Sequence, residues 1–483
     1  SYFDELHSIF PGKNVLDIEG HNGGRRTDDD GYEGLVMAAG KGFRLCLDFL
    51  TDMTPFLVWS NTDTIIDSAI KKLRTSNPET QVQMAYKLVE IQLSLIYDYL
   101  YTKYGALQFR LGLVSSGIER LITFFSTLAA LGLFVGANLK GPFNYSREDV
   151  MVSYVLLAGA ITLDISSIFM LISSYWLQLH RRGGLFGCSF SLAKCVHAGS
   201  KPLWSEKIAQ YNLIDACIQE ERGGIICGWV MRRTGIVSDI NMSNTVSPEL
   251  KKLVLDKLFE VASTRSVSDY WDWDFSKYRG MWLQWWLQEG RIQADIAQGI
   301  LTDGITDTDL YFPMTVIVWH IATEMCWFAD EDDYSPCRAP SMELSRYVMY
   351  LVAKRDVMSG SNGHFELGKA RRQVKRILEG RGISDERGLL KYARQATGQV
   401  TEPCFGRARA ISEHLLKISN RALRWELISM LWIEMLCYLG PNCGAQFHAK
   451  HLSTGGEFVT HVRILLVVLG IPFLRSDMKP GKF

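Results

Sequence analysis

Two long segments without charged side chains lie close together in the chain, and they limit its possible folds more than any other feature. Residues 121–139 carry no charge, and residues 150–179 carry one, at Asp164. A helix that crosses the hydrocarbon core of a bilayer needs about 20 mainly apolar residues, so both segments are long enough. A buried core helix is the alternative for the first segment, but two such runs in tandem are unusual in a soluble domain. We therefore predict two antiparallel transmembrane helices, 121–139 and about 151–176.

Charge and cysteine content exclude several other classes of protein. The 483 residues include 52 Lys and Arg and 52 Asp and Glu, so the formal net charge is zero. No long basic run offers a groove for phosphates, and we expect no nucleic-acid partner. The ten cysteines are too scattered for a secreted disulfide scaffold, and we expect most of them to be reduced and buried. The Gly-rich stretch at 380–388 follows no predicted strand, so it is no dinucleotide fingerprint and we expect no cofactor.

Turn and capping signals divide the segment that precedes the membrane hairpin. Residues 20–34 are rich in Gly and charge and predict a long loop. Ser76 can cap a helix and Pro78 suits its first turn, so we predict a helix from there to about Tyr104.

Almost no strand alternation is present, and the whole chain predicts an all-α fold. We expect an N-terminal helical region over 1–110, the transmembrane hairpin within 111–182 and a large helical soluble domain over 183–483. The chain begins at Ser1 without a signal-peptide pattern, so we expect a piece of a longer protein or a processed one.

Asp164 is the only charge in the second membrane segment. An intramembrane carboxylate is costly, and it indicates either a functional site, such as ion coupling, or a hydrogen bond across packed helices. Both interpretations stay open from the sequence. Gly132 and Gly136 form a GxxxG pattern in the first segment, which predicts close approach of the two backbones.

His320 and Glu324 are a candidate polar pair in the apolar segment 316–329. Residues four apart meet on one face of a helix, and such a pair could do acid–base work if both side chains were buried together. Neither an HExxH zinc pattern nor a nucleophile elbow accompanies them. A structural polar pair in a helical core is the alternative.

Cysteine and histidine gather near the C-terminus, where Cys437, Cys443, His448 and His451 are weak candidates for metal ligands. Structural zinc sites usually bring ligands in tighter pairs, two to four residues apart. We therefore expect no metal here.

The alternative for the same stretch is a helix end, a short loop and a second helix. We predict that the first helix ends at Gly440-Pro441, because proline lacks the N–H and crowds the preceding turn. A helix from Ala445 would end at Gly455-Gly456, and Glu457 would start the last apolar helix. In this interpretation His448 is a buried hydrogen-bonding residue.

Several blocks of sequence resemble a plant membrane-protein family that carries the domain of unknown function 4220. These blocks are 85–105, 122–134, 153–164, 209–218, 318–326 and 344–352. A partner domain, domain of unknown function 594, is similar to the segment from about 420 to 470. Its pattern appears as W-x-E-M-L-x-Y from Trp432 to Tyr438, followed by Cys443, His448 and the "GGE" at 455–457.

The resemblance implies a plant integral membrane protein with a large helical cytoplasmic region, and further membrane helices upstream. It implies no reaction and no catalytic residue. Cys443 and His448 fall on the family pattern, whereas His451 stands where another polar residue is common, which puts binding by four ligands in doubt.

We therefore expect a membrane protein of the plasma membrane or endomembranes whose partners are the lipid bilayer and other membrane or cytoplasmic proteins. The leading interpretation of its function is a non-enzymatic structural, signalling or interaction module. One alternative is a transporter component with Asp164 in its pathway, and a second is an enzyme that uses His320 and Glu324. By the positive-inside rule both flanks of the hairpin are cytoplasmic, because basic residues outside the two spans gather there: Lys103, Arg110, Arg120, Arg181, Arg182 and Lys194.

Overall fold

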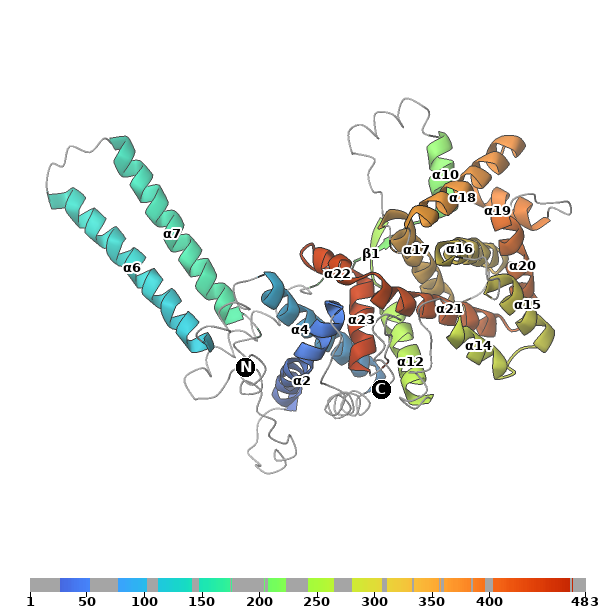
Figure 1. Cartoon of the computed structure of the whole chain (residues 1–483), viewed down its shortest axis with the longest axis horizontal. Helices are drawn as coiled ribbons and strands as arrows, with labels where there is room; N and C mark the ends of the chain where they lie inside the picture. The colour runs from blue at the N-terminus through green and yellow to red at the C-terminus, as the bar shows by residue number, and fades with distance from the viewer. Residues whose placement is uncertain are drawn as a thin grey trace, which may run out of the picture. The chain divides into compact units, whose positions relative to one another are not determined.

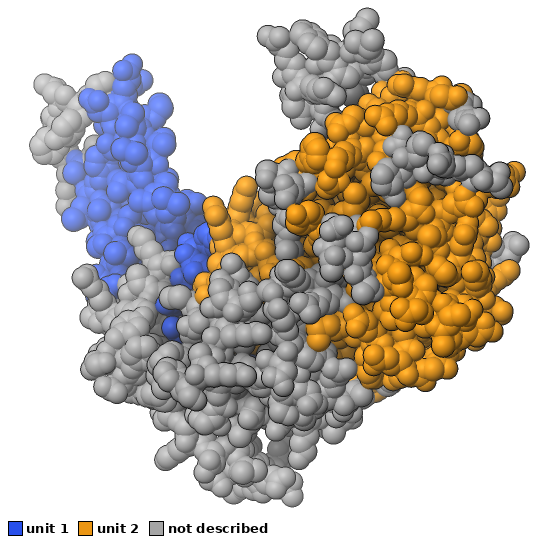
Figure 2. Space-filling view, turned by 45° about the vertical axis from the view of Figure 1, so that its right-hand side comes forward, with its two compact units in different colours: residues 1–44, 87–204 blue, residues 45–86, 205–483 orange. Residues whose placement is uncertain are grey.

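The computed structural model describes residues 27–52, 77–101, 112–140, 147–173, 175, 204, 207–222, 242–264, 280–305, 311–331, 334–355, 357, 360–383, 385–395, 403–469 and 471. These residues form helices almost throughout, together with one two-stranded sheet (Figure 1), which confirms the predicted all-α fold. The chain divides into two compact units, which Figure 2 shows in blue and orange. Unit 1 comprises residues 1–44 and 87–204, and unit 2 comprises residues 45–86 and 205–483. The domain boundaries predicted after residues 110 and 182 fall outside the described residues.

Two long antiparallel helices, α6 (Gly112–Lys140) and α7 (Arg147–Ser173), form a hairpin in unit 1 (Figure 1). Their most apolar stretches, Glu119–Ala137 and Arg147–Phe169, each have a mean hydropathy of 1.7 and are long enough to cross a membrane. Neither stretch is buried inside the protein. The two predicted apolar helices and their hairpin arrangement are therefore confirmed.

One face of α6 forms the contact with α7. Thr127 hydrogen-bonds to Asp164 of α7, and the ring of Phe134 lies 5.2 Å from that of Tyr154. The close approach predicted at Gly132 and Gly136 is wrong, because a Cβ atom at either position would meet no described atom within 4 Å. At 100° per residue these glycines lie on the side of the helix opposite Thr127 and Phe134.

Helix α2 (Thr27–Leu50) begins earlier than the sequence predicts. The loop predicted over 20–34 is wrong from Thr27 onward, and the residues before Thr27 lie outside the described part of the chain.

Helix α4 (Pro78–Tyr101) begins at Pro78, as predicted. The predicted cap Ser76 and the predicted end Tyr104 lie outside the described residues. Within unit 1, the buried amide of Gln92 donates a hydrogen bond of 2.9 Å to the carbonyl of Ala39 in α2.

In unit 2, helix α16 (Phe312–Ala329) is apolar on almost every side and is buried from Phe312 to Cys326 except at Met314. Its neighbours are α17 (Arg338–Lys354), α18 (Gly360–Arg381), α19 (Glu386–Gln395) and α20 (Pro403–Lys417). The other helices are α10 (Leu213–Arg222), α12 (Pro248–Thr264), α14 (Met281–Gln288), α15 (Ala294–Gly304), α21 (Arg421–Asn442), α22 (Ala445–Leu452) and α23 (Phe458–Val468). Strands β1 (Lys207–Gln210) and β2 (Met242–Thr245) pair antiparallel, with Lys207 opposite Thr245.

Helix α21 continues through Gly440-Pro441 to Asn442, so the predicted helix end is wrong by two residues. Proline fixes φ near −65°, which a helix accepts, and it removes only one hydrogen bond in the last turn. The carbonyl of Tyr438 is bound there by the side chain of Asn442 at 2.8 Å. Gly444, at φ 78°, then separates α21 from α22, and Gly455 and Gly456, both at positive φ, follow α22 as predicted.

A buried ion pair holds three helix ends together in unit 2. Arg424 in α21 binds the carboxylate of Asp330, which directly follows α16, and both side chains are only 5% exposed. The remaining guanidinium donors of Arg424 reach carbonyls at the end of α20, those of Leu415, Leu416 and Ile418, at 2.9, 3.3 and 2.7 Å. Removal of Arg424 leaves the buried Asp330 with only the half-exposed guanidinium of Arg421, at 3.8 Å, so this pair is expensive to break.

We predict that Arg424→Met lowers the free energy of unfolding of the full chain in detergent by about 3–5 kcal/mol. The matched control is Arg387→Met, which breaks the ion pair to Glu331, where the two side chains are 65% and 45% exposed. An exposed pair contributes less than about 1 kcal/mol, so the control changes little. Equal losses in both variants, measured by chemical denaturation, would contradict the role of the buried pair.

Candidate functional site

Helix α16 places His320 and Glu324 one turn apart in the core of unit 2, both fully buried. The His320 ring lies between the start of helix α10 and helix α17. Its Nδ1 is 2.9 Å from Ser345 Oγ in α17, and its Nε2 accepts the backbone N–H of Leu213 in α10 at 3.4 Å. An Nε2 that accepts a hydrogen bond carries no proton, so the ring is neutral with its proton on Nδ1. Burial, with Arg346 nearby, lowers the pKa of His320 to about 3.

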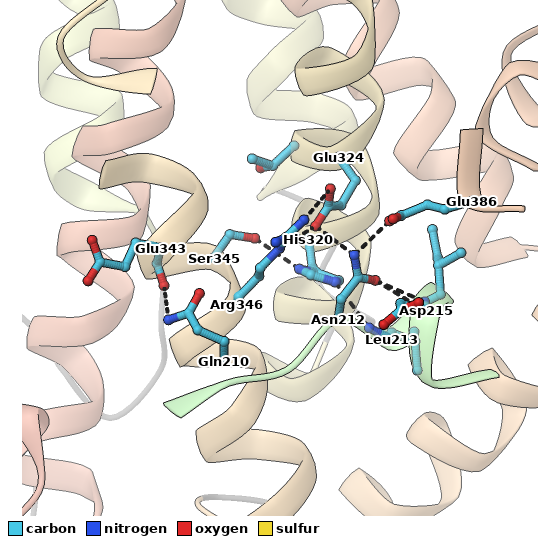
Figure 3. Close-up of polar contacts among 12 residues, drawn as sticks. Gln210, Asn212, Leu213, Asp215, His320, Glu324, Glu343, Ser345, Arg346 and Glu386 are labelled. Carbon is cyan, nitrogen blue, oxygen red and sulfur yellow. Dashed lines mark hydrogen bonds and ion pairs between the residues drawn. The ribbon is translucent and has the colours of Figure 1, made fainter. Parts of the chain in front are cut away.

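Glu324 binds a different set of partners (Figure 3). Arg346 donates to both of its carboxylate oxygens, from Nε at 3.0 Å and from Nη2 at 3.4 Å, and Asn212 donates from Nδ2 at 3.1 Å. Burial raises the pKa of Glu324 to about 7, although the charge of Arg346 opposes this rise. Glu324 therefore holds its proton to a higher pH than an exposed glutamate does.

Asn212 connects Glu324 to the chain segment that follows β1. Its Oδ1 accepts the backbone N–H groups of Ile214 and Asp215 at 2.9 and 3.3 Å, which caps the N-terminus of α10. Its Nδ2 lies 2.6 Å from Glu386 in α19 as well as 3.1 Å from Glu324. Figure 3 shows Asn212 between the two carboxylates.

This constellation joins elements rather than opening toward a substrate. His320 and Glu324 lie on one helix face, as the sequence predicts, but each side chain is bound to its own partners. The backbone of Tyr211 adds a bond of 3.1 Å to the carbonyl of Arg346. The contacts attach the segment from β1 to α10 onto helices α16, α17 and α19.

His448, from the C-terminal stretch, satisfies the end of helix α21. Its Nε2 donates to the carbonyl of Gly440 at 2.8 Å, and its Nδ1 accepts from the hydroxyl of Thr460 at 2.9 Å. The side chain is completely buried, which confirms the predicted hydrogen-bonding core residue. Burial and the charge of Arg463 hold the pKa of His448 well below its usual value.

Arg463 and Asp52 complete the same junction. Arg463 in α23 donates to the carbonyls of Gly440 and Phe49 and to Asp52 Oδ1, the last at 2.8 Å. Asp52 Oδ2 accepts the backbone N–H of Ala445 at 2.7 Å, so it caps α22 from a distant part of the chain.

The four weak metal candidates do not converge. Among the described residues no group of three or more His, Cys, Asp or Glu side chains is arranged to hold a metal ion. His451 bonds locally, since its Nδ1 donates to the carbonyl of Phe447 at 2.8 Å. Burial raises the pKa values of the Cys437 and Cys443 thiols, and a thiol binds metal as the thiolate.

Sequence reasoning missed Glu434, which has the same structural role as His448. This buried carboxylate in α21 accepts the backbone N–H of Leu283 at 3.0 Å, at the start of helix α14, whose own N-cap residue is Gly280. Burial raises the pKa of Glu434 to about 7, and the helix N–H groups oppose the rise. An acidic residue inside the apolar run 427–439 was the available signal.

Asp164 lies within the hairpin of unit 1 and is partly exposed. Its Oδ2 is 3.1 Å from the hydroxyl of Thr127 in α6. One turn away, Arg120 of α6 donates to the hydroxyl of Ser167. The carboxylate thus takes part in a row of polar contacts between the two helices.

These features define a class of protein: an all-α chain with two helices that are long and apolar enough to cross a membrane. Two family models match it, the Domain of unknown function (DUF4220) over residues 11–217 and the Protein of unknown function, DUF594, over residues 417–471. The chain carries both family domains, which confirms the resemblance seen in the sequence. The blocks at 318–326 and 344–352, with His320 and Glu324, lie outside both matches.

Comparison with curated proteins and with solved structures found no match. Neither family description names an activity. Asp164 and Asn212 fall in the first match, and the four cysteine and histidine candidates fall in the second.

We predict that His320 makes unfolding pH-dependent between about pH 6.5 and 3. Its folded pKa is lowered, so its contribution to stability is fully present above pH 6.5 and is lost as pH falls toward 3. The loss is at most about 1.4 kcal/mol per pH unit. His320→Gln keeps one donor and one acceptor but does not titrate, so it should unfold with a shallower dependence on pH in this window.

Wild type must be compared with the His320→Gln variant, because Glu324 and Glu434 change the stability with pH in the direction opposite to His320. Their folded pKa values are raised, so their contributions are present below about pH 4.5 and are lost as pH rises toward 7. Denaturant titrations of both proteins between pH 7 and pH 4 give the difference directly. Parallel curves would contradict a neutral buried His320.

We also predict that the purified protein contains no stoichiometric zinc. His448 already has both ring nitrogens bound by protein groups, so its replacement should reduce stability without changing metal content. Elemental analysis of wild type and of a Cys443→Ala, His448→Ala variant measures this. One zinc per chain that disappears in the variant would refute the prediction.

Proposed function

We propose that this is an integral membrane protein, anchored by the α6–α7 hairpin, whose unit 2 is a non-enzymatic structural, signalling or interaction module. One observation carries the proposal: the hairpin exposes its large apolar side chains. Leu133 and Leu163 are 76% and 72% exposed. Exposure of so many apolar groups is unfavourable in water and favourable in lipid.

The buried polar residues of unit 2 support the non-enzymatic part of the proposal. His320, Glu324 and His448 each have their hydrogen-bonding atoms directed at backbone or side-chain groups of neighbouring elements. The enzyme alternative would need these bonds to open so that His320 and Glu324 could reach a substrate. Their complete burial favours a structural role.

The transporter alternative rests on Asp164. A hydrogen bond to Thr127 across the hairpin favours a role in helix packing, because intramembrane polar groups commonly bond to a neighbouring helix. Transport would require further helices that surround Asp164 with an aqueous path. An aqueous thiol reagent that modifies Asp164→Cys would support it.

For orientation we propose cytoplasmic flanks and a cytoplasmic unit 2, from the basic residues on both sides of the hairpin. A Ser200→Cys reporter that reacts only from the lumen would overturn this orientation. The plant origin and the choice between plasma membrane and endomembranes remain predictions from the resemblance.

Carbonate extraction of membranes tests the anchor. We expect the wild-type chain to stay in the membrane pellet, and Leu156→Arg with Leu163→Arg to release it, since each arginine near a helix centre costs about 2.5–3.5 kcal/mol on insertion. The control replaces two exposed residues of unit 2, Tyr311→Arg with Tyr334→Arg, and should stay in the pellet. Complete extraction of the wild type would overturn the proposal.

A further inference from the structure

The neutral chain contains a strongly basic segment. Residues 354–424 include sixteen Lys and Arg and only seven Asp and Glu, an excess of nine positive charges. Because the whole chain has no net charge, the remaining residues carry an equal negative excess. Such an asymmetry indicates a partner of opposite charge more directly than the total charge does.

Helix α18 presents part of this charge on one face. Phe365, Lys369, Arg372 and Arg376 follow one another at spacings of four, three and four residues, so they lie on one side of the helix. Phe365 is 57% exposed, and the ammonium group of Lys369 lies 4.2 Å from the centre of its ring and 2.9 Å from the carboxylate of Glu366. We call these four residues the outer face of α18.

The opposite side of α18 is buried in unit 2, with apolar residues at Leu367, Ala370, Val374, Ile377 and Leu378. The flank beside α10 is neutralised, because Arg371 pairs with Glu220, and Lys375 with Glu220 and Glu221 at 3.1 and 3.6 Å. These contacts fix the helix to the body of the unit. They also leave the outer face turned away from the acidic residues of α10.

Helix α19 adds a second set of exposed basic residues. Arg387, Lys391 and Arg394 recur at spacings of four and three, while Leu389, Leu390 and Ala393 are buried. Two consecutive helices of unit 2 are thus anchored by their apolar sides and expose cationic side chains.

We propose that the outer face of α18, with the exposed cations of α19, docks unit 2 onto an anionic lipid bilayer. The proposal rests on the membrane anchoring proposed above, because the hairpin would keep unit 2 close to a bilayer at all times. Charge complementarity identifies the surface as anionic, since phosphatidylserine headgroups attract lysine and arginine near a membrane. Phe365 beside Lys369 matches the mixture of aromatic and basic side chains found at membrane interfaces.

The test uses the full chain reconstituted in two kinds of vesicle, one of phosphatidylcholine alone and one with phosphatidylserine added at about one part in three. An amine-reactive reagent labels exposed lysines, and mass spectrometry measures the extent at each site. We expect labelling of Lys369 and Lys391 to fall about fivefold with phosphatidylserine, and molar salt to restore it. Lys207, exposed on β1, serves as the reference and should not change.

Arg372→Glu with Arg376→Glu should abolish the protection of Lys369. The matched control, Lys252→Glu with Lys450→Glu, makes the same change in net charge on other helices and should preserve the protection of Lys369.

Equal labelling of Lys369 in both kinds of vesicle would overturn the proposal, provided that the protein resists carbonate extraction from both. Loss of the protein on carbonate extraction would instead refute the anchor itself, and with it the docking that depends on it. Protection of Lys369 by RNA but not by phosphatidylserine would assign the face to nucleic acid and overturn the proposal.

Discussion

The need to satisfy buried helix ends determines the polar interior of unit 2. Every helix leaves N–H groups at its start and carbonyl groups at its end without partners in the helix, and burial makes such groups costly. In this unit, side chains from other helices supply the partners: Glu434 at the start of α14, Arg424 at the end of α20 and His448 at the end of α21. Titratable residues that could be taken for a catalytic or metal site are therefore placed where the backbone requires them.

The same interactions unite regions that are far apart in the sequence. Asp52, within the DUF4220 match, binds Arg463 and the N-terminus of α22, both within the DUF594 match. Tyr86, also in the first match, lies parallel to Phe458 at the start of α23, with ring centres 6.5 Å apart. Residues 45–86 and 205–217 of the first match therefore belong to the same compact unit as the whole of the second match.

The sequence predicted features that depend on local pattern, and it failed where a tertiary contact decides. The hairpin follows from length and absence of charge, and Pro78 marks the start of α4 because proline suits a first helical turn. The end of α21 was misplaced, since Pro441 is tolerated where Asn442 and His448 bind the free carbonyls. The partners of His320 and Glu324 come from α17, from the start of α10 and from Asn212 just before it, and no spacing within α16 reveals them.

The state of the His448 ring tests the central claim that these buried polar residues serve the fold. Nitrogen-15 spectra of the full chain, labelled only at histidine and assigned with a His448→Gln variant, report the protonation of each ring nitrogen. The contacts predict a proton on Nε2 alone, unchanged between pH 7 and pH 5 and unaffected by added zinc. A ring that titrates near its ordinary pKa, or an Nε2 signal that shifts when zinc binds, would contradict the account.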